Sequence, residues 1–464
     1  MQKSLLVLMV LAACGDDGVH KLADAPPAPD DAQIDAPNSG VVTLTVIQDG
    51  SPRPGVDVYF LNGDNTVVAK MATNAQGVAT ATMVAGGSVT AIDPFLIKSS
   101  GHDLRTFVGV KPGDNLHLTQ GGTAAQNVEV NFEVVLPGDS FASTYELHSN
   151  CGSSYFSANS GSGSGSGSIG GPTSWYGCGA TVDVLLQTFD FNGNAVGAIY
   201  KAGVALTEGG TLDLTSSAYT TPLPNSTINW SNIPAAYTGL QARVVLASSK
   251  GVLSTISLNP GPITAGAASL AFPRPTVTNG IEITQTQPSQ TTFAAQGLVD
   301  WAPQASTPVA VDVGAGLLAT YAAAPSVSGA TRTVTWSAGA GASPDFVWAT
   351  LRASRPAGKS STFWDWDIVV PYGSTTFTLP LLPTEVAQYN FAATDSVEVS
   401  ELITAKVPGG YDAVRGDILT SEGPHQFVTG ATGRIAYENL PLVSTGRTLP
   451  SLRSWSNRPR PLRK

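Results

Sequence analysis

The stretch that decides the fold reads SPRPGVDVYFLNGDNTVVAKMATNAQGVATATMVAGGSVTAI and spans residues 51–92. Apolar and polar residues tend to alternate within it, as they do in strands that bury one face. The alternating segments are 41–47 just before it, then 56–61, 66–71, 77–83 and 87–92. Turn-forming residues separate them, namely Asp49-Gly50, Asn62-Gly63-Asp64-Asn65 and Asn74-Ala75-Gln76-Gly77. The sequence therefore predicts a run of β-hairpins.

The same stretch resembles the carboxypeptidase-regulatory-like and bacterial Ig-like domains of secreted proteins. Those families share the pattern Pro-x-Gly-Val-x-Val-x-Phe, then Thr-Asn-x-x-Gly-Val-Ala, then a glycine-led strand. The matching residues are Pro54, Gly55, Val56, Val58, Phe60, Thr73, Asn74, Gly77, Val78 and Ala79. The resemblance covers about 55 of the 464 residues and implies a β-sandwich without catalytic residues.

The rest of the chain has the composition of β-structure. Charged residues make up 12% of it, against about 25% in ordinary globular chains. Short alternating runs are separated by turn residues, and no stretch has sustained helical periodicity. Two similar segments, Ile228-Asn229-Trp230-Ser231 and Val334-Thr335-Trp336-Ser337, each place a tryptophan within such a run and predict two related sandwiches with a core tryptophan. We expect an all-β protein with several Ig-like or fibronectin-like β-sandwich domains, preceded by a signal peptide and a disordered tether.

The N-terminus has the features of an export signal. One positive charge at Lys3 precedes an apolar run over 5–11, which is too short to span a bilayer. The following Leu11-Ala12-Ala13-Cys14 resembles the lipobox of bacterial lipoproteins, which implies that residues 1–14 are a lipoprotein signal peptide and that Cys14 is acylated. The alternative is an ordinary secretory signal that is cleaved nearby, with Cys14 discarded. Because Gly15 rather than aspartate follows Cys14, the resemblance favours the outer membrane or the cell surface.

Residues 15–40 form a predicted tether. The segment is rich in Asp, Ala and Pro, and its six aspartates against Lys21 give it a charge of about −5. Such a segment cannot bury a core and stays extended, so it is expected to hold the first domain up to roughly 80 Å from the lipid.

We expect four folded segments after the tether: a carboxypeptidase-regulatory-like or Ig-like sandwich (41–127), a β domain (128–214), a small β domain (215–275) and fibronectin-like sandwiches (276–440). A basic, proline-rich tail (441–464) follows. Its basic residues do not imply nucleic-acid binding. The tail is interpreted as a solvated extension, with contact to anionic lipopolysaccharide or phosphate as the alternative.

The second segment contains the other two cysteines, Cys151 and Cys178. An exported protein is expected to pair them as a structural disulfide, and the absence of CxxC spacing argues against a redox role. Between them lies the Gly-Ser alternation 160–168, and beside it stand Trp175 and Tyr176. Those aromatics are candidates either for stacking on sugar rings or for packing beneath the loop.

The strand-like segment Phe363 to Ile368 carries a second set of candidates. A period of two places Trp364, Trp366 and Ile368 on one face and Phe363, Asp365 and Asp367 on the other. The two aspartates would lie about 7 Å apart, as acid and base do in glycosidases. The alternative is that they are ordinary solvent-facing acids, since no second acidic cluster completes a site.

Other chemistry lacks a sequence basis. The five histidines show no metal-binding spacing, and no nucleophile elbow, P-loop or dinucleotide motif is present. The half calcium loop at Asp190, Asn192 and Asn194 is better explained as a hairpin turn. We therefore predict no enzyme, no cofactor and no metal.

Three functions remain as hypotheses. The first is a non-catalytic cell-envelope lipoprotein, held to the membrane by its lipid, that presents sandwiches for structural or adhesive binding to an envelope protein or a glycan. The second is a carbohydrate-binding surface protein that uses an exposed row formed by Trp175, Tyr176, Trp364 and Trp366. The third is a glycoside hydrolase that uses Asp365 and Asp367.

Overall fold

The computed structural model describes residues 39–95, 101–120, 129–139, 142–157, 168–261, 263–289, 295–304, 308–319, 321–357, 360–419 and 432–441. The predicted signal peptide, Cys14, almost all of the tether and nearly all of the basic tail lie outside the described residues. So does most of the Gly-Ser segment 160–168. Among the described residues, no helix is long and apolar enough to cross a membrane.

The first sandwich is built by the segment with the repeated hairpins. One sheet contains β1 (Ser39–Gln48), β2 (Ser51–Pro52), β5 (Val78–Val84) and β8 (Asn115–Gln120), in which β1 pairs antiparallel with β2 and β5 and parallel with β8. The facing strands are β3 (Asp57–Leu61), β4 (Val67–Ala72), β6 (Gly87–Ile92) and β7 (Gly101–Val110). Asp49 and Gly50 both have positive φ, 49° and 75°, as the two-residue turn between β1 and β2 requires.

The second sandwich has its own two sheets. One has the order β12 (Ser168–Tyr176), β9 (Glu129–Pro137), β15 (Gly210–Asp213), and the other the order β11 (Ser153–Ser157), β10 (Thr144–Ser149), β13 (Thr181–Phe189), β14 (Ala195–Ala205). Side chains from both sheets form one core that includes Phe132, Tyr145, Leu147 and Trp175.

The third sandwich surrounds the predicted core residue Trp230. One sheet has the order β19 (Ala268–Pro273), β16 (Asn225–Ser231), β22 (Val309–Asp312), and the facing strands are β17 (Gly239–Ser248), β18 (Gly251–Leu258), β20 (Ile281–Ser289) and β21 (Ala295–Pro303). Trp230 is buried in its core, and its indole Nε1 donates to Thr286 Oγ1 at 2.9 Å.

The fourth sandwich contains the other predicted core tryptophan, Trp336, which is also buried. One sheet has the order β23 (Tyr321–Ser328), β24 (Thr333–Ala338), β27 (Thr376–Thr378), and the facing strands are β25 (Phe346–Ala357), β26 (Ser360–Pro371) and β28 (Ser396–Lys406). The short helix η2 (Thr384–Tyr389) contributes Val386 and Tyr389 to the same core.

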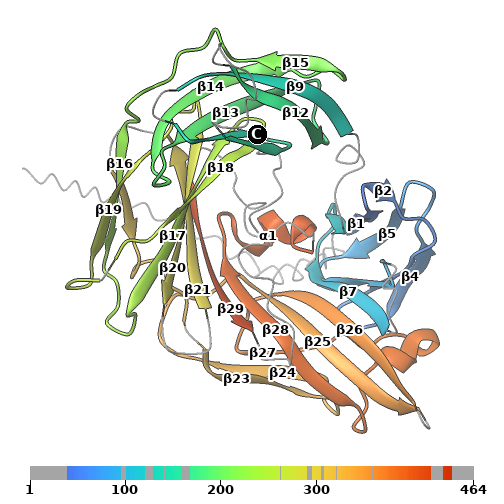
Figure 1. Cartoon of the computed structure of the whole chain (residues 1–464). Helices are drawn as coiled ribbons and strands as arrows, with labels where there is room; N and C mark the ends of the chain where they lie inside the picture. The colour runs from blue at the N-terminus through green and yellow to red at the C-terminus, as the bar shows by residue number, and fades with distance from the viewer. Residues whose placement is uncertain are drawn as a thin grey trace, which may run out of the picture. The chain divides into compact units, whose positions relative to one another are not determined.

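One long sheet joins three of these sandwiches. Its twelve strands have the order β18-β17-β20-β21-β29-β28-β25-β26-β7-β6-β3-β4, with β29 (Gly433–Pro441) between the third and fourth sandwiches (Figure 1). The junction with the first sandwich is the parallel pairing of β7 with β26, where Trp366 Nε1 donates to Thr106 Oγ1 at 2.8 Å. The all-β class and the several sandwiches predicted from the sequence are therefore confirmed.

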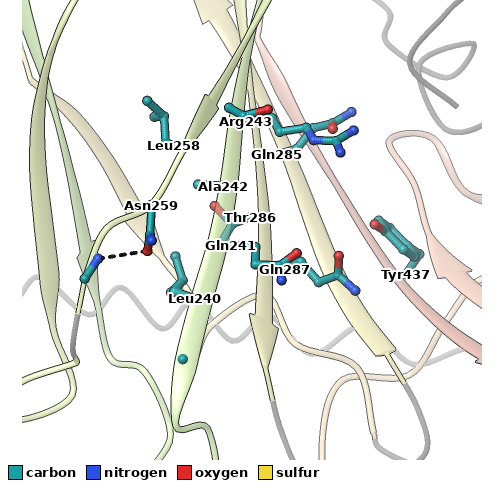
Figure 2. Close-up of a pocket in the computed structure, with 13 residues that line it drawn as sticks. Leu240, Gln241, Ala242, Arg243, Leu258, Asn259, Gln285, Thr286, Gln287 and Tyr437 are labelled. Carbon is teal, nitrogen blue, oxygen red and sulfur yellow. Dashed lines mark hydrogen bonds between the residues drawn. The ribbon is translucent and has the colours of Figure 1, made fainter. Parts of the chain in front are cut away.

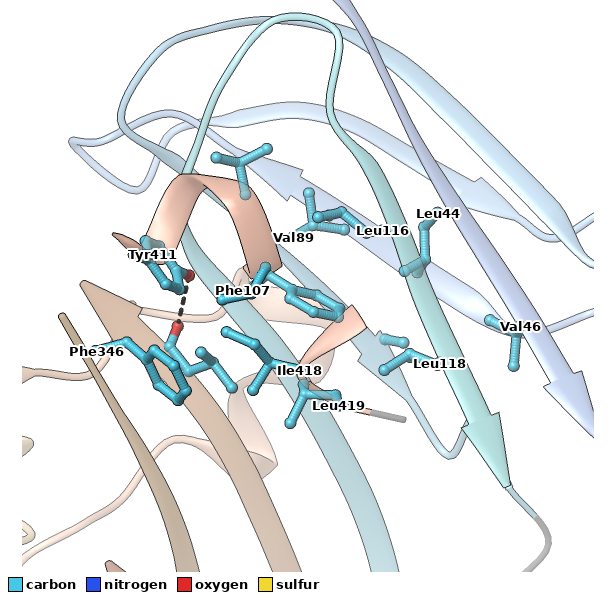
Figure 3. Close-up of a cluster of buried hydrophobic side chains, with 14 of the residues drawn as sticks. Leu44, Val46, Val89, Phe107, Leu116, Leu118, Phe346, Tyr411, Ile418 and Leu419 are labelled. Carbon is cyan, nitrogen blue, oxygen red and sulfur yellow. Dashed lines mark hydrogen bonds between the residues drawn. The ribbon is translucent and has the colours of Figure 1, made fainter. Parts of the chain in front are cut away.

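A short helical segment packs against the long sheet near this junction. It comprises α1 (Gly410–Val414) and η3 (Arg415–Asp417), and its Tyr411, followed by Ile418 and Leu419, joins the core of the first sandwich (Figure 3). The Tyr411 hydroxyl donates to the carbonyl of Val108 on β7 at 2.7 Å. Buried Arg415 pairs with Asp114 at 2.7 Å, so the segment is held by both packing and charge.

The strands of a sandwich fall on both sides of some predicted domain borders and on one side of others. The strands of the second sandwich all lie within 128–214. The border between 275 and 276 falls inside the third sandwich, because β17 pairs with β20 and β16 with β22 across it. The border between 440 and 441 falls at the end of β29. The described residues between 39 and 441 belong to one compact unit.

Candidate functional site

The predicted row of sugar-stacking aromatics is not exposed. Trp175, Trp364 and Trp366 are 1%, 1% and 0% exposed, so none offers a ring face to a ligand. Trp175 packs edge-on against Phe132 at 4.9 Å between the two sheets of its sandwich. This burial contradicts the hypothesis of an exposed sugar-binding row for these three tryptophans, and for Trp175 it agrees with the alternative that the ring packs inside the protein. Only Tyr176 is exposed, at 51%.

The period of two along β26 is confirmed, since Trp364, Trp366 and Ile368 lie together in the core of the fourth sandwich. That core is closed over them by η2 and the residues after it, where Phe391 lies 5.6 Å from the Trp366 ring. Cys151 and Cys178 are joined by a disulfide within the second sandwich.

The aspartates on the other face of β26 are held in ion pairs. Asp365 accepts from Arg352 Nε at 3.0 Å, and both side chains are 38% exposed. Asp367 is buried, pairs with Arg105 and accepts a hydrogen bond from the hydroxyl of Thr350. A guanidinium thus neutralises each member of the candidate acid pair.

A third aspartate completes this charged network. Asp103 lies opposite Asp365 across the β7–β26 pairing, is 1% exposed and accepts from Arg105 Nε at 3.0 Å. Burial raises the pKa of its carboxyl to about 6. A raised pKa marks catalytic acids in many enzymes, but a general acid must reach its substrate. The buried Asp103 and Asp367 are better explained as the two partners of the half-buried Arg105 guanidinium.

A pocket on the long sheet is the strongest candidate site. It encloses about 470 Å³ over β17, β18, β20 and β29 (Figure 2). It is lined by Gly239, Leu240, Gln241, Ala242, Arg243, Ser257, Leu258, Asn259, Gly261, Gln285, Thr286, Gln287 and Tyr437. We call it the amide-lined pocket, after the side chains of Gln241, Asn259, Gln285 and Gln287.

Strand alternation places these side chains. Along β17, Leu240, Ala242 and Val244 are buried in the core of the third sandwich, so Gln241 and Arg243 project from the opposite face. Gln287 lies directly opposite Gln241 on the neighbouring β20. Directly opposed side chains in an antiparallel pair have Cβ atoms about 5 Å apart and can contact one ligand together.

The wall of the pocket depends on one glycine. Tyr437 lies opposite Gly297 in the β21–β29 pairing, and a Cβ at Gly297 would lie 2.3 Å from the Tyr437 ring. The absent side chain lets the ring lie across β21 beside the pocket (Figure 2). Burial raises the pKa of the Tyr437 phenol to about 12, so it remains a hydrogen-bond donor at neutral pH.

The side chains that line the amide-lined pocket are mainly hydrogen-bonding groups. Its described lining holds amides, hydroxyls and one guanidinium, but no carboxylate, imidazole, thiol or lysine. Gln287 Oε1 is buried and has no hydrogen-bond partner in the described structure, so it is an acceptor that a bound molecule or water would satisfy. The lining thus offers hydrogen bonds without a base or a thiolate to start a reaction.

Sequence reasoning missed this pocket. Its signal was the alternation Gln-Ala-Arg at 241–243 and Thr-Gln-Thr-Gln at 284–287, which is equally typical of a strand with a solvated face. A second open hollow of about 670 Å³ lies over Asn131, Glu133, Pro172 and Ser174 on the second sandwich. Within the described part of the chain, no group of three or more His, Cys, Asp and Glu side chains is arranged to hold a metal ion.

Comparisons with known proteins do not identify a family. No protein-family model and no curated protein matches the chain. Among solved structures, the Bacillus anthracis TIE protein matches at 11% identity and a TM-score of 0.14, over 59% of this chain and 50% of its own. The chain thus spans about half the length of that protein.

Two further structures match with similar scores. A streptococcal ancillary pilin matches at 8% identity and a TM-score of 0.14, over 59% of this chain and 98% of the pilin. The tip fimbrial protein Mfa3 from Porphyromonas gingivalis, with a C-terminal truncation, matches at 9% identity and 0.14, over 53% and 100%. At these TM-scores the likenesses carry no argument, so function is argued from the residues of the chain itself.

Proposed function

We propose that this chain is a non-catalytic cell-envelope lipoprotein, anchored at the outer membrane or cell surface through Cys14, that binds an envelope or surface molecule in the amide-lined pocket. The observation that carries the binding role is the pocket lining of four amides, three hydroxyl-bearing side chains and Arg243, without a catalytic carboxylate or imidazole. The lipobox resemblance of residues 11–14 and the acidic tether support the anchorage.

The frame around the pocket suits a binding role. β17 and β20 both have hydrogen-bonded neighbours on each side, and the core of the third sandwich supports them from behind. Binding sites built on paired strands hold their side chains in place, which lowers the entropy lost when a ligand is bound. The pocket is therefore pre-organised.

The aspartates of β26 do not favour the hydrolase hypothesis. Glycosidases need one carboxyl free to protonate the leaving group and another free to attack or to activate water. Here Asp365 and Asp367 each accept a charged hydrogen bond from an arginine. We therefore propose a structural role for both.

Anchorage is tested by membrane fractionation and intact mass of the protein expressed in a bacterial host. We expect the wild type to begin at an acylated Cys14 and to sediment with membranes, and Cys14→Ser to be released. A wild type that is soluble and unacylated would refute the anchor.

Binding is tested with the full chain carrying Cys14→Ser, incubated with purified cell envelopes. We expect it to sediment with them, and the Gln241→Ala/Gln287→Leu double variant to stay in the supernatant. Soluble fragments released from the envelopes over time would indicate an enzyme and contradict the proposal. If both proteins sediment equally, the amide-lined pocket is not the binding site.

A further inference from the structure

The arrangement of hydrogen-bonding groups indicates what kind of molecule fits the amide-lined pocket. A primary amide offers one acceptor oxygen and two N–H donors. A sugar hydroxyl both donates and accepts, so vicinal hydroxyls match an amide in either direction. Gln241 and Gln287 stand directly opposite each other, with Asn259 also in the lining. The buried, unpartnered Oε1 of Gln287 requires a donor, which a hydroxyl supplies.

The charge of the lining indicates an acidic group on that molecule. Arg243 is the one cation of the described lining, which contains no Asp or Glu, although the whole chain has a net charge of −10. Guanidinium and carboxylate form paired hydrogen bonds of matched geometry. A single arginine provides for one carboxylate but not for the several phosphates that a nucleic acid presents.

Two features of the strands argue against a peptide. An extended peptide binds by adding to a free sheet edge, but β17 and β20 are each paired on both sides. A peptide also needs apolar pockets for its side chains. Leu240 and Ala242, which contribute to the lining, are 5% and 4% exposed because their side chains belong to the core behind the sheet.

From these observations we infer that the amide-lined pocket binds an acidic saccharide, with its hydroxyls on Gln241, Gln287 and Asn259 and its carboxylate on Arg243. The inference rests on the proposed function and adds the class of ligand. A pocket of about 470 Å³ lies in the range of small-molecule sites and accommodates about one or two sugar rings. Longer chains would continue over the open side of the pocket.

The test is calorimetric titration of the full-length protein in detergent with tetrasaccharides of galacturonate, of mannuronate or guluronate, and of hyaluronan. Each acid is compared with its carboxyl-reduced, neutral counterpart. We expect at least one acid to bind and its neutral form to bind at least tenfold more weakly. Gln287→Leu should weaken binding at least tenfold, and Arg243→Gln should remove the preference for the acid over the neutral form.

Matched controls separate the pocket from the rest of the surface. Gln76→Ala and Lys201→Gln remove an exposed amide and an exposed charge elsewhere and should leave binding unchanged. If Gln287→Leu or Arg243→Gln lowers the melting temperature, Gln241→Ala takes its place as the pocket variant, because Gln241 is exposed. Equal binding of acid and neutral forms, or binding that none of the pocket variants alters, would overturn the inference.

Failure of the ligand class and failure of the pocket are distinguishable. If no acidic tetrasaccharide binds while envelope sedimentation still depends on Gln241 and Gln287, the ligand class is wrong and the proposed binding site stands. If sedimentation is also independent of both residues, the proposed site is wrong as well.

Discussion

Replacing Arg105 by methionine is the sharpest test of whether the acids of β26 are structural. Arg105 is 19% exposed and pairs with Asp103 and Asp367, whose side chains are 1% and 8% exposed. Methionine keeps much of the aliphatic volume but leaves two buried carboxylates without their cation. Removing one partner of a buried ion pair costs about 3–5 kcal/mol. We expect the free energy of unfolding of Arg105→Met to fall by that amount at pH 8.

The matched control is Arg352→Met on the neighbouring strand. Arg352 pairs with Asp365 at 3.0 Å, but both side chains are 38% exposed. Exposed pairs contribute about 0–1 kcal/mol, so this variant should unfold almost as the wild type does. The two substitutions differ in the burial of the ion pairs that they break and in the number of aspartates left without a cation, which is two for Arg105 and one for Arg352.

The assay is urea unfolding followed by tryptophan fluorescence at pH 8 and pH 5. Burial raises the pKa of the Asp103 carboxyl to about 6 and the Arg105 guanidinium opposes that rise. Without the guanidinium, this carboxyl therefore takes up a proton more readily in the folded state as the pH falls. The folded state then binds more protons than the unfolded state, so the loss should be smaller at pH 5 than at pH 8. Equal, small effects of Arg105→Met and Arg352→Met at both pH values would refute the reasoning.

Three other predictions concern stability. Replacing Cys151 and Cys178 by serine should lower the free energy of unfolding of the second sandwich by about 3.5 kcal/mol, from the 27-residue separation; a change below 1 kcal/mol in a denaturation series would contradict this. Trp366→Ala should lower the free energy of unfolding by about 3–5 kcal/mol, because it leaves a cavity where the fully buried ring lies beside the β7–β26 pairing. An unchanged melting temperature would contradict this placement of Trp366. Burial raises the pKa of Glu438 from 4.5 to about 7, so its contribution to stability falls as the pH rises through that window. Glu438→Gln should therefore equal the wild type near pH 4.5 and exceed it by up to about 3 kcal/mol at pH 8, and a variant that is less stable at pH 8 would show the sign to be wrong.

Local features were predictable from the sequence. The alternating segment 56–61 corresponds to β3 at Asp57–Leu61, and 87–92 corresponds to β6 at Gly87–Ile92. Trp230 and Trp336 lie in cores as expected. These features depend on a period of two and on turn residues, which are properties of neighbouring residues.

The partners of the strands were not predictable in the same way. β7 and β26 pair although Thr106 and Trp366 are 260 residues apart in the chain. The alternation of apolar and polar residues along a strand shows which side chains share a face, but not which other elements cover that face. For this reason the shared face of Trp364 and Trp366 was predicted correctly, whereas the sequence left open whether that face is exposed or buried.

The pocket was hidden for a related reason. Its glutamines occupy alternate positions on β17 and β20, and such positions normally face water. Only the pairing of these strands, and the placement of Tyr437 over Gly297 from β29, brings the polar side chains around one hollow. No local motif carries that information.

The most direct test of the central claim is hydrogen–deuterium exchange of the full chain, measured by mass spectrometry with and without envelope material. A ligand in the amide-lined pocket should slow exchange in residues 239–261 and 281–289, and the Gln241→Ala/Gln287→Leu variant should lose that protection. Protection confined to other parts of the chain, such as the hollow on the second sandwich, would contradict the account.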